Sequence, residues 1–175
     1  LKNLGDKPSV ERFELNYLNS SGNHFIMAKA GVLESMFAGI GLEYLNYNPS
    51  KNYAIGFDIY DVKKRDYTYD FEMLDYEITT GHINYYHYFH PLELTTHISW
   101  GKYLAGDEGL TFDFSRRFKN GTTFGAFFSL TDISEEEFGE GSFDKGFYFS
   151  FPIEIFLNRH SSGRTYLGLK PLSLI

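Results

Sequence analysis

Strict alternation of side-chain character is the feature that most limits what this chain can fold into. Over residues 36–44 every second side chain is apolar or aromatic, whereas the positions between them include Gly39, Gly41 and Glu43. Residues 53–59 repeat the pattern. A period of two residues is the period of a β-strand that has one apolar and one polar face. The sequence therefore predicts β-hairpins.

The same alternation occurs about nine times along the 175 residues. Many of these stretches approach the ~9–11 residues with which a tilted strand crosses a bilayer. Because turn-forming residues separate them, we expect an all-β fold of antiparallel up-and-down strands over residues 1–156 and an irregular tail over residues 157–175. The expected strands lie near residues 13–18, 24–33, 36–47, 53–62, 77–89, 92–103, 110–118, 122–131 and 146–156.

Two stretches interrupt the alternation, and we expect each of them to form a long loop. Residues 63–76 hold three basic and four acidic residues, although Tyr67, Tyr69 and Phe71 offer an alternative strand. Residues 131–145 are strongly acidic. They lack the regular Asp spacing of a dedicated calcium loop, so we expect this segment to be a solvated loop.

The Asn-Gly pair at 120–121 tests the register between two expected strands. A two-residue loop over this pair mixes the apolar and polar faces of the strands. A three-residue loop over 119–121 instead places Phe112 opposite Phe128, so that the faces agree. We therefore expect a type I turn with Gly121 in the left-handed conformation of a G1 bulge.

Alternation alone does not say whether the apolar face meets lipid or the core of a soluble protein. The mean hydropathy of -0.32 fits both cases, because membrane-barrel strands are only half apolar. Aromatic residues make up 19% of the chain, and aromatic side chains suit strands and the interface girdles of membrane barrels. Many polar positions are small, for example Gly56, Thr111 and Ser129, and small side chains leave room in an interior. The sequence therefore favours a transmembrane β-barrel, or part of one, with its polar face inside.

This assignment divides the candidate residues between two faces. Asp113, Ser115 and Arg117 alternate along one strand, where they form either a ladder that contacts a glycan or an ion-pair network that fills the interior. Outward aromatic residues near strand ends suit an interface girdle, namely Tyr44, Tyr53, Trp100 and Phe118. The candidate lumen-lining residues are Glu43, Asp58, His82, His97, Asp113, Ser115 and Arg117. The candidate lipid-facing residues are Phe112, Phe114, Phe124, Phe128 and Phe149.

Four histidines cluster in the sequence, but their pattern does not favour a metal site. An even-length loop near His90 puts His82 and His97 on the polar face with Asn84 between them, and His87 on the other face. Zinc requires three or four converging ligands. We therefore expect histidines that form hydrogen bonds and no bound metal.

Glu43 and Asp58 face inward on neighbouring expected strands and are similar in that respect to the carboxylate pair of a glycosidase. Polar barrel interiors commonly carry such carboxylates, and the sequence contains no nucleophile elbow or phosphate loop. We therefore expect no catalytic residues and no cofactor. The net charge of -7 argues against a nucleic-acid partner, whose phosphates would be repelled.

Several ordered segments carry a resemblance to a known family. They are residues 75–82 (DYEITTGH), 101–109 (GKYLAGDEG), 111–118 (TFDFSRRF) and 137–146 (EFGEGSFDKG). Together they resemble the YjbH-like family of exopolysaccharide-biosynthesis proteins, which are outer-membrane β-barrel proteins. The resemblance is specific over about residues 75–170. Because family members are much longer, it implies that this chain is a C-terminal portion, and it brings no catalytic residues.

The pattern and the resemblance together predict a Gram-negative outer-membrane β-barrel component of exopolysaccharide or capsule biosynthesis or export, which guides the polymer without chemistry. Its expected partners are outer-membrane lipid, surface polysaccharide and other polysaccharide-assembly proteins. Two alternatives stand beside it. One is a soluble β-barrel or sandwich that binds a sugar or lipid, and the other is a glycan-modifying enzyme.

Overall fold

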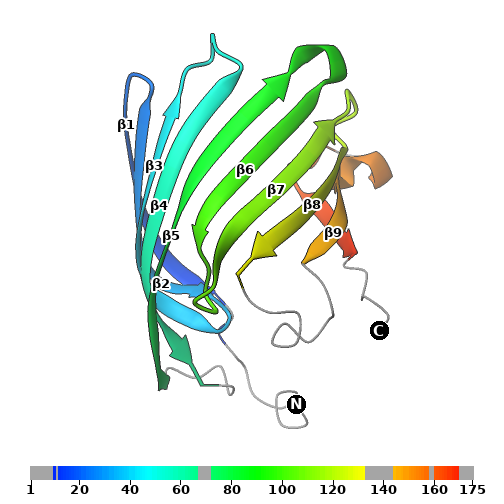
Figure 1. Cartoon of the computed structure of the whole chain (residues 1–175). Coiled ribbons are helices and arrows are strands. Elements are labelled where there is room, and N and C mark those ends of the chain that lie inside the picture. The colour runs from blue at the N-terminus through cyan, green and yellow to red at the C-terminus, as the bar shows by residue number, and fades with distance from the viewer. Residues whose placement is uncertain (1–9, 11, 67–71, 133–143, 158–159, 170–175) are drawn as a thin grey trace.

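Ten strands follow one another through one sheet in the order in which they occur in the chain (Figure 1). The computed structural model describes residues 10, 12–66, 72–132, 144–157 and 160–169. No helix in these ranges is both long and apolar enough to cross a membrane. The strands are β1 (Phe13–Ser21), β2 (His24–Glu34), β3 (Phe37–Tyr47), β4 (Tyr53–Arg65), β5 (Met73–Phe89), β6 (Leu94–Lys102), β7 (Glu108–Arg117), β8 (Thr123–Thr131), β9 (Lys145–Pro152) and β10 (Arg164–Leu169), with short 3-10 helices η1 (His90–Leu92) and η2 (Ile153–Phe156) in two of the turns.

Every strand pairs antiparallel with the next, which confirms the predicted all-β, up-and-down fold. β1 to β8 are between 9 and 17 residues long. Strands of that length suit a bilayer crossing and exceed the usual ~5–6 residues of globular strands. The sheet has one strand more than the sequence predicted.

The additional strand is β10, so the expectation of an irregular tail over residues 157–175 is wrong for this segment. β10 pairs with β9, and Leu167 lies opposite Phe149. Its alternation covers only six residues, too few to stand out in the sequence. β9 is correspondingly shorter than the expected strand at 146–156. It ends at Pro152, where the missing N–H of proline helps to stop the ladder and η2 begins.

The expected loop over residues 63–76 is also shorter than predicted, because β4 and β5 extend into it. Lys63 lies directly opposite Glu77, and the register shifts just beyond this pair. Opposite charges on directly paired residues favour the extension of the ladder. The alternative strand through residues 67–71 lies outside the described residues, as does most of the acidic loop over 131–145.

The turn between β7 and β8 has the predicted three-residue form. The backbone N–H of Phe118 donates to the carbonyl oxygen of Thr122, with 2.8 Å between N and O, and Gly121 has a φ of 82°. Phe112 therefore lies directly opposite Phe128, and their rings stack with centroids 5.0 Å apart. Because a slip of one residue would reverse every side chain, this turn keeps the two faces separate.

One face of the sheet carries large apolar side chains across all ten strands, and most of them are exposed. The register places apolar side chains of one strand beside apolar side chains of the next, as where Leu42 lies opposite Ile59. Ile83 in the middle of β5 is 54% exposed, whereas the polar residues Asn84 and Ser99 on the other face are buried. Soluble proteins usually bury the apolar side chains instead. The sheet therefore has the inverted distribution, with its apolar residues outside.

The opposite, mainly polar face is concave, and glycines allow the sheet to curl toward it. Gly101 and Gly109 lie opposite each other in β6 and β7, and a Cβ on either would overlap the backbone of the neighbouring strand. Gly31 and Gly39 form a similar pair in β2 and β3. Strands approach on this side more closely than a side chain permits. Glycine is therefore required at these positions of the sheet.

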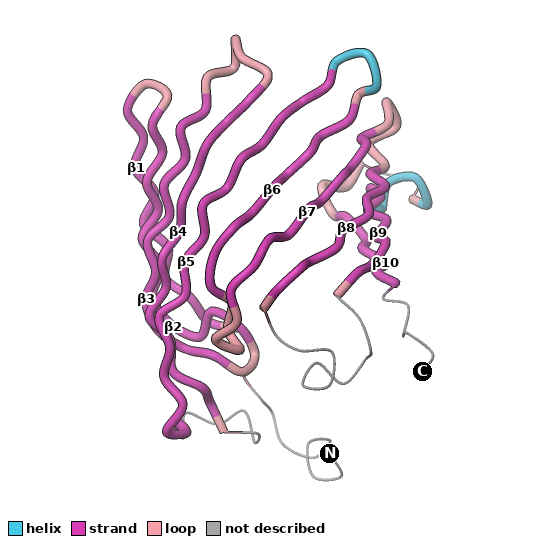
Figure 2. The backbone as a smooth tube through the Cα atoms, in the orientation of Figure 1, coloured by secondary structure: helices cyan, strands magenta, loops and turns pink. Residues whose placement is uncertain are grey.

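The sheet is curved but not closed. Among the described residues β1 pairs only with β2, and β10 only with β9, so one edge of each strand is left without a strand partner. Figure 2 shows the hairpin turns gathered at the two ends of the strands, with the η1 turn at one of these ends. An open, curved antiparallel sheet is compatible with part of a barrel.

Arg65 fixes the end of the sheet at which β2 turns into β3. Its side chain is fully buried, and Nη1 donates to the carbonyl oxygens of Val10 at 2.8 Å and Ser35 at 2.9 Å. Its backbone N–H donates to the carbonyl oxygen of Met36 at 2.8 Å. One residue thereby ties the segment before β1 to the β2–β3 turn.

Replacing Arg65 with alanine should lower the free energy of unfolding by about 3 kcal/mol, because two charge-assisted hydrogen bonds are lost. Arg116→Ala is the matched control, since Arg116 is exposed and its ion pair with Glu93 spans 3.6 Å. We expect the control to cost less than about 1 kcal/mol. Urea titration of the folded protein measures both. Equal losses would contradict the anchoring role.

Candidate functional site

The concave face gathers the residues that the sequence assigned to the lumen. Glu43, Asp58 and His82 lie directly opposite one another in β3, β4 and β5. His97 and Asp113 are opposed in β6 and β7. Further along β7, the same face carries Ser115 and Arg117. The five candidate lipid-facing residues all lie on the apolar face, namely Phe112, Phe114, Phe124, Phe128 and Phe149.

A row of polar contacts, here called the polar belt, crosses the concave face from β2 to β9. At its β2 end Lys29 Nζ lies 2.7 Å from Glu43 Oε1, and the hydroxyl of Tyr60 donates to the same oxygen. The ring of Tyr60 lies over Gly41, where a Cβ would overlap it. The belt consists of Lys29, Glu43, Asp58, Tyr60, His82, Asn84, His97, Asp113 and Tyr148.

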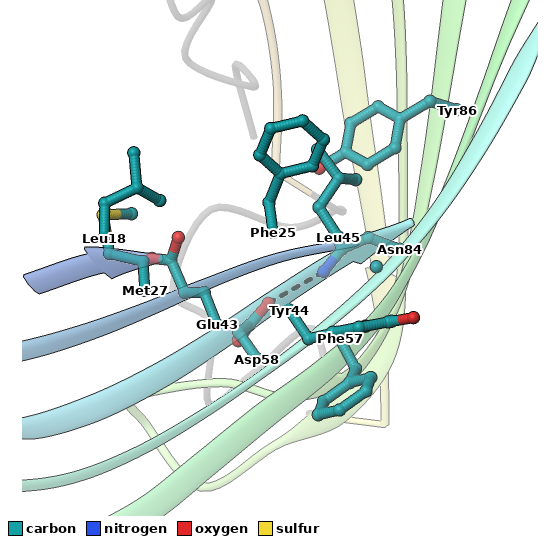
Figure 3. A pocket seen from close by; sticks show the side chains of 11 residues that line it. Leu18, Phe25, Met27, Glu43, Tyr44, Leu45, Phe57, Asp58, Asn84 and Tyr86 are labelled. Carbon is teal, nitrogen blue, oxygen red and sulfur yellow. Dashed lines mark hydrogen bonds between the residues drawn. The ribbon is translucent and has the colours of Figure 1, made fainter. Parts of the chain in front are cut away.

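Asp58 is the centre of the polar belt. Its Oδ1 lies 2.9 Å from His82 Nδ1, and its Oδ2 accepts from Asn84 Nδ2 at 2.8 Å, the contact dashed in Figure 3. Asn84 Oδ1 in turn lies 2.8 Å from His97 Nε2, and the His97 ring stacks on Tyr86 with centroids 4.4 Å apart. Asn84 therefore links the two histidines, in the position that the sequence predicted. Both oxygens of Asp58 are therefore engaged by side chains of β5.

The β9 end of the belt depends on a glycine. The hydroxyl of Tyr148 donates to Asp113 Oδ1 at 2.9 Å, although β8 lies between the two strands. The Tyr148 ring crosses β8 at Gly125, where a Cβ would overlap the ring. Asp113 thus bonds to a tyrosine, and Arg117 forms no ion pair with any described residue. The charged ladder expected along β7 is present as an alternation of residues, without an ion-pair network between them.

The histidines are divided as the sequence predicted. The loop over 90–93 has an even length, because Phe89 lies opposite Leu94. His87 therefore falls on the apolar face, where its ring packs against that of Phe89 with centroids 4.3 Å apart. Within the described ranges, no group of three His, Cys, Asp or Glu residues is arranged to hold a metal ion.

Beside the polar belt, the concave face contains a cleft of about 410 Å³ (Figure 3). Apolar side chains form much of its lining, with Leu18 directly opposite Met27 and Phe25 directly opposite Leu45. Figure 3 shows Phe25, Leu45 and Tyr86 gathered on one side of the strands. These residues make an apolar wall on a face that is otherwise mainly polar.

The polar lining of this cleft is part of the belt. Glu43, Asp58 and Asn84 all contribute to it. A second cleft of about 300 Å³ shares Glu43 and Asp58 and is lined in addition by charged residues, among them Arg12, Glu14 and Lys29. The two clefts therefore adjoin at the centre of the belt. Together they offer hydrogen-bonding groups next to apolar surfaces, which is the usual make-up of a small-molecule site.

Over residues 5–173 the sequence matches the model of a family described as "Exopolysaccharide biosynthesis protein YbjH". The chain belongs to this YjbH family. "Uncharacterized lipoprotein YjbH" of Escherichia coli (strain K12) is 36% identical over 169 residues, which cover 94% of this chain and 24% of the relative. The YjbH-family chain thus spans about a quarter of the length of that relative. No solved structure matches it.

Two features of this YjbH-family chain escaped the sequence analysis. Tyr148 reaches Asp113 across an intervening strand. Alternation along single strands does not predict a contact between two strands that are not neighbours. The apolar wall does leave a signal, because Leu18, Phe25 and Met27 occupy positions that belong to the polar face. Large apolar residues out of phase with the alternation are therefore the pattern that would have pointed to the cleft.

Gly125→Ala should displace the Tyr148 ring and cost about 1–3 kcal/mol of unfolding free energy, because overpacking forces side chains out of their rotamers. Tyr148→Phe removes the hydrogen bond to Asp113 without adding an atom at Gly125 beneath the ring. Because both changes break one contact, we expect the double variant to cost less than the sum of the single variants. Chemical denaturation of the four proteins provides the cycle. Strict additivity would show that Gly125 does not serve the Tyr148–Asp113 contact.

Proposed function

We propose that this chain is part of a transmembrane β-barrel of the bacterial outer membrane that supports exopolysaccharide or capsule production by guiding the polymer, without catalysis. The observation that carries the proposal is the inverted sheet, whose apolar face is exposed on every strand while its polar face is concave and partly buried. A soluble barrel or sandwich has the opposite arrangement. Membership of an exopolysaccharide-biosynthesis family supports the biological role.

Lipid is the medium that suits the exposed apolar face. The side chains of Ile40, Leu42, Phe57 and Ile83 are each more than 40% exposed and lie on the three neighbouring strands β3, β4 and β5. A continuous apolar surface of this kind is a liability in water. In hydrocarbon it is the expected exterior of a barrel. The name of the relative, a lipoprotein, also fits a location in the cell envelope.

The open edges of the sheet bear on the same proposal. Backbone N–H and C=O groups in hydrocarbon must all be hydrogen-bonded, so a membrane barrel must close. β1 and β10 do not pair with each other within the described residues. We propose that strands beyond these residues complete the barrel, and the greater length of the relative supports this.

Aromatic residues at the strand ends suit the two interfaces of a membrane. Tyr53 begins β4 and Phe118 follows β7, both at one end of the sheet, whereas Trp100 lies near the opposite end in β6. All three are more than a third exposed on the apolar face. Amphipathic rings favour the headgroup region, so these residues would form parts of two aromatic girdles.

The absence of catalysis in our proposal is supported by how the central carboxylates are engaged. Glu43 is paired with Lys29 and accepts from Tyr60, and Asp58 accepts from His82 and Asn84. A glycosidase needs one carboxyl group that is protonated and able to reach the substrate. The contacts of Glu43 and Asp58 instead fit the polar lining of a barrel interior.

Ile83→Arg should test the lipid contact. If Ile83 faces hydrocarbon at mid-strand, an arginine there should cost about 2–4 kcal/mol in lipid. Leu92→Arg is the matched control, because Leu92 is 61% exposed but lies in the η1 turn beyond the strands. Near or outside the interface the cost should fall to about 0–1 kcal/mol.

Denaturant titration of the protein in phospholipid vesicles measures both free energies. The same protein should leave the membrane fraction of cells only with detergent. Equal and small costs for the two variants, together with release by salt alone, would favour the soluble sugar- or lipid-binding alternative.

Glu43→Gln and Asp58→Asn test the enzyme alternative. The amides keep hydrogen-bonding groups in the cleft but cannot act as general acid or base. If the protein only guides the polymer, each variant should lower polysaccharide output by less than about tenfold, whereas loss of a general acid or base typically costs about 100-fold or more. Surface polysaccharide per cell at matched protein level is the measurement. A loss of two orders of magnitude in either variant would favour catalysis.

A further inference from the structure

We propose that the cleft beside the polar belt is a binding site for a short stretch of a neutral polysaccharide chain, and that it discriminates against acidic sugars. This inference rests on the proposed function, since it assigns a ligand to the interior of the same barrel. It concerns the cleft of about 410 Å³ between the β1–β3 part of the sheet and Tyr86 on β5.

The apolar wall is the first observation that points to a ligand. Leu18 is 64% exposed and lies opposite Met27, and Phe25 lies opposite Leu45, all on the concave face. The remainder of this face is built mainly of small or hydrogen-bonding residues, which suit a water-filled interior. A sugar ring has an apolar face of C–H groups. Apolar and aromatic side chains at this point therefore provide a surface on which a pyranose can stack.

The polar lining next to this wall provides acceptors for sugar hydroxyl groups. Lys29 and Tyr60 both contact Oε1 of Glu43, and Oε2 has no hydrogen-bond partner among the described residues. Each carboxylate has about four lone-pair sites, so Asp58 also keeps capacity beyond its contacts with His82 and Asn84. The hydroxyl edge of a ring stacked on the wall would thus meet carboxylate oxygens as hydrogen-bond acceptors.

The charge of the lining determines which glycans fit. Glu43 and Asp58 are the acidic residues of this cleft, and its lining contains no Lys, Arg or His. In the adjoining cleft, Arg12 is already paired with Glu14 and Lys29 with Glu43. A uronic-acid carboxylate would find no basic partner here and would be repelled by both carboxylates. Neutral hexose units meet neither penalty.

The dimensions of the site favour a chain over a single sugar. The cleft lies within the ~300–1,000 Å³ range of small-molecule sites and is open at its side. It adjoins the second cleft of about 300 Å³ at Glu43 and Asp58. Two adjoining clefts on one concave surface suit consecutive units of a polymer.

Binding of neutral and acidic oligosaccharides to the full-length protein in lipid nanodiscs tests the inference. The probes are gluco-, galacto- and mannohexaose as neutral chains and hexagalacturonate as the acidic chain, measured by calorimetry and by saturation-transfer NMR. We expect at least one neutral hexaose to bind and hexagalacturonate to bind at least about tenfold more weakly, a difference of about 1.4 kcal/mol.

Phe25→Leu should weaken binding of that neutral hexaose by about tenfold, because the stacking surface is lost. Phe127→Leu is the matched control, since Phe127 lies on the same concave face in β8 and does not line the cleft. It should leave the affinity within twofold. Retention of both variants in the membrane fraction shows that folding is intact.

Three results would overturn the site: no binding of any neutral hexaose, equal binding of hexagalacturonate, or equal effects of the two phenylalanine variants. Each of these leaves the proposed function standing if the protein is still an integral membrane protein. Release of the wild-type protein from membranes without detergent would instead overturn the proposed function itself.

Discussion

The register between neighbouring strands is the constraint on which the rest of this structure depends. Each hairpin pairs apolar residues with apolar residues, so ten strands share one continuous apolar face. A shift of one residue in any hairpin would turn its large side chains to the concave side. The G1-bulge turn at Gly121 shows how strictly this is set, because one loop residue decides whether Phe112 meets Phe128. The membrane proposal follows from the continuity of that face.

Curvature is the second requirement, and the concave face meets it with glycine. Paired glycines such as Gly101 and Gly109 let strands approach where a Cβ would meet backbone. Gly41 and Gly125 serve a different purpose. Because neither has a side chain, the ring of Tyr60 lies over Gly41 and the ring of Tyr148 lies over Gly125. The hydroxyl groups of these rings donate to Glu43 and Asp113, so glycines also make room for the polar belt.

The concave face also separates two kinds of chemistry. Along the belt, the carboxylates contact hydroxyl, amide and imidazole groups and the cation Lys29, and these contacts fix their positions. In the adjoining cleft, the same carboxylates stand beside apolar side chains and retain free acceptor positions. A surface that combines the two can hold hydroxyl-rich chains weakly at several points. That is the property a polymer-guiding interior requires, because a tight site would stop movement.

Much of the fold could be read from the sequence, because its signals are local. Alternation identified nine of ten strands, the loop at 119–121 fixed one register, and the parity of the loop after Phe89 separated His87 from His82 and His97. β10 was missed because six exposed residues give too short a pattern. The extension of β4 and β5 into residues 63–76 was missed because pairing between strands, including Lys63 with Glu77, outweighed weak local periodicity.

By itself, the sequence determined the period of two, which residues lie on the apolar face and which on the polar face, and the small residues of the concave side. Each of these depends only on neighbours within one strand. Only the tertiary structure decided which carboxylate meets which donor. The tilt and curl of the sheet set how far Tyr148 reaches across β8 and how Leu18, Phe25, Met27 and Leu45 come together. Such contacts join residues on different strands, and their geometry arises from the bending of the whole sheet.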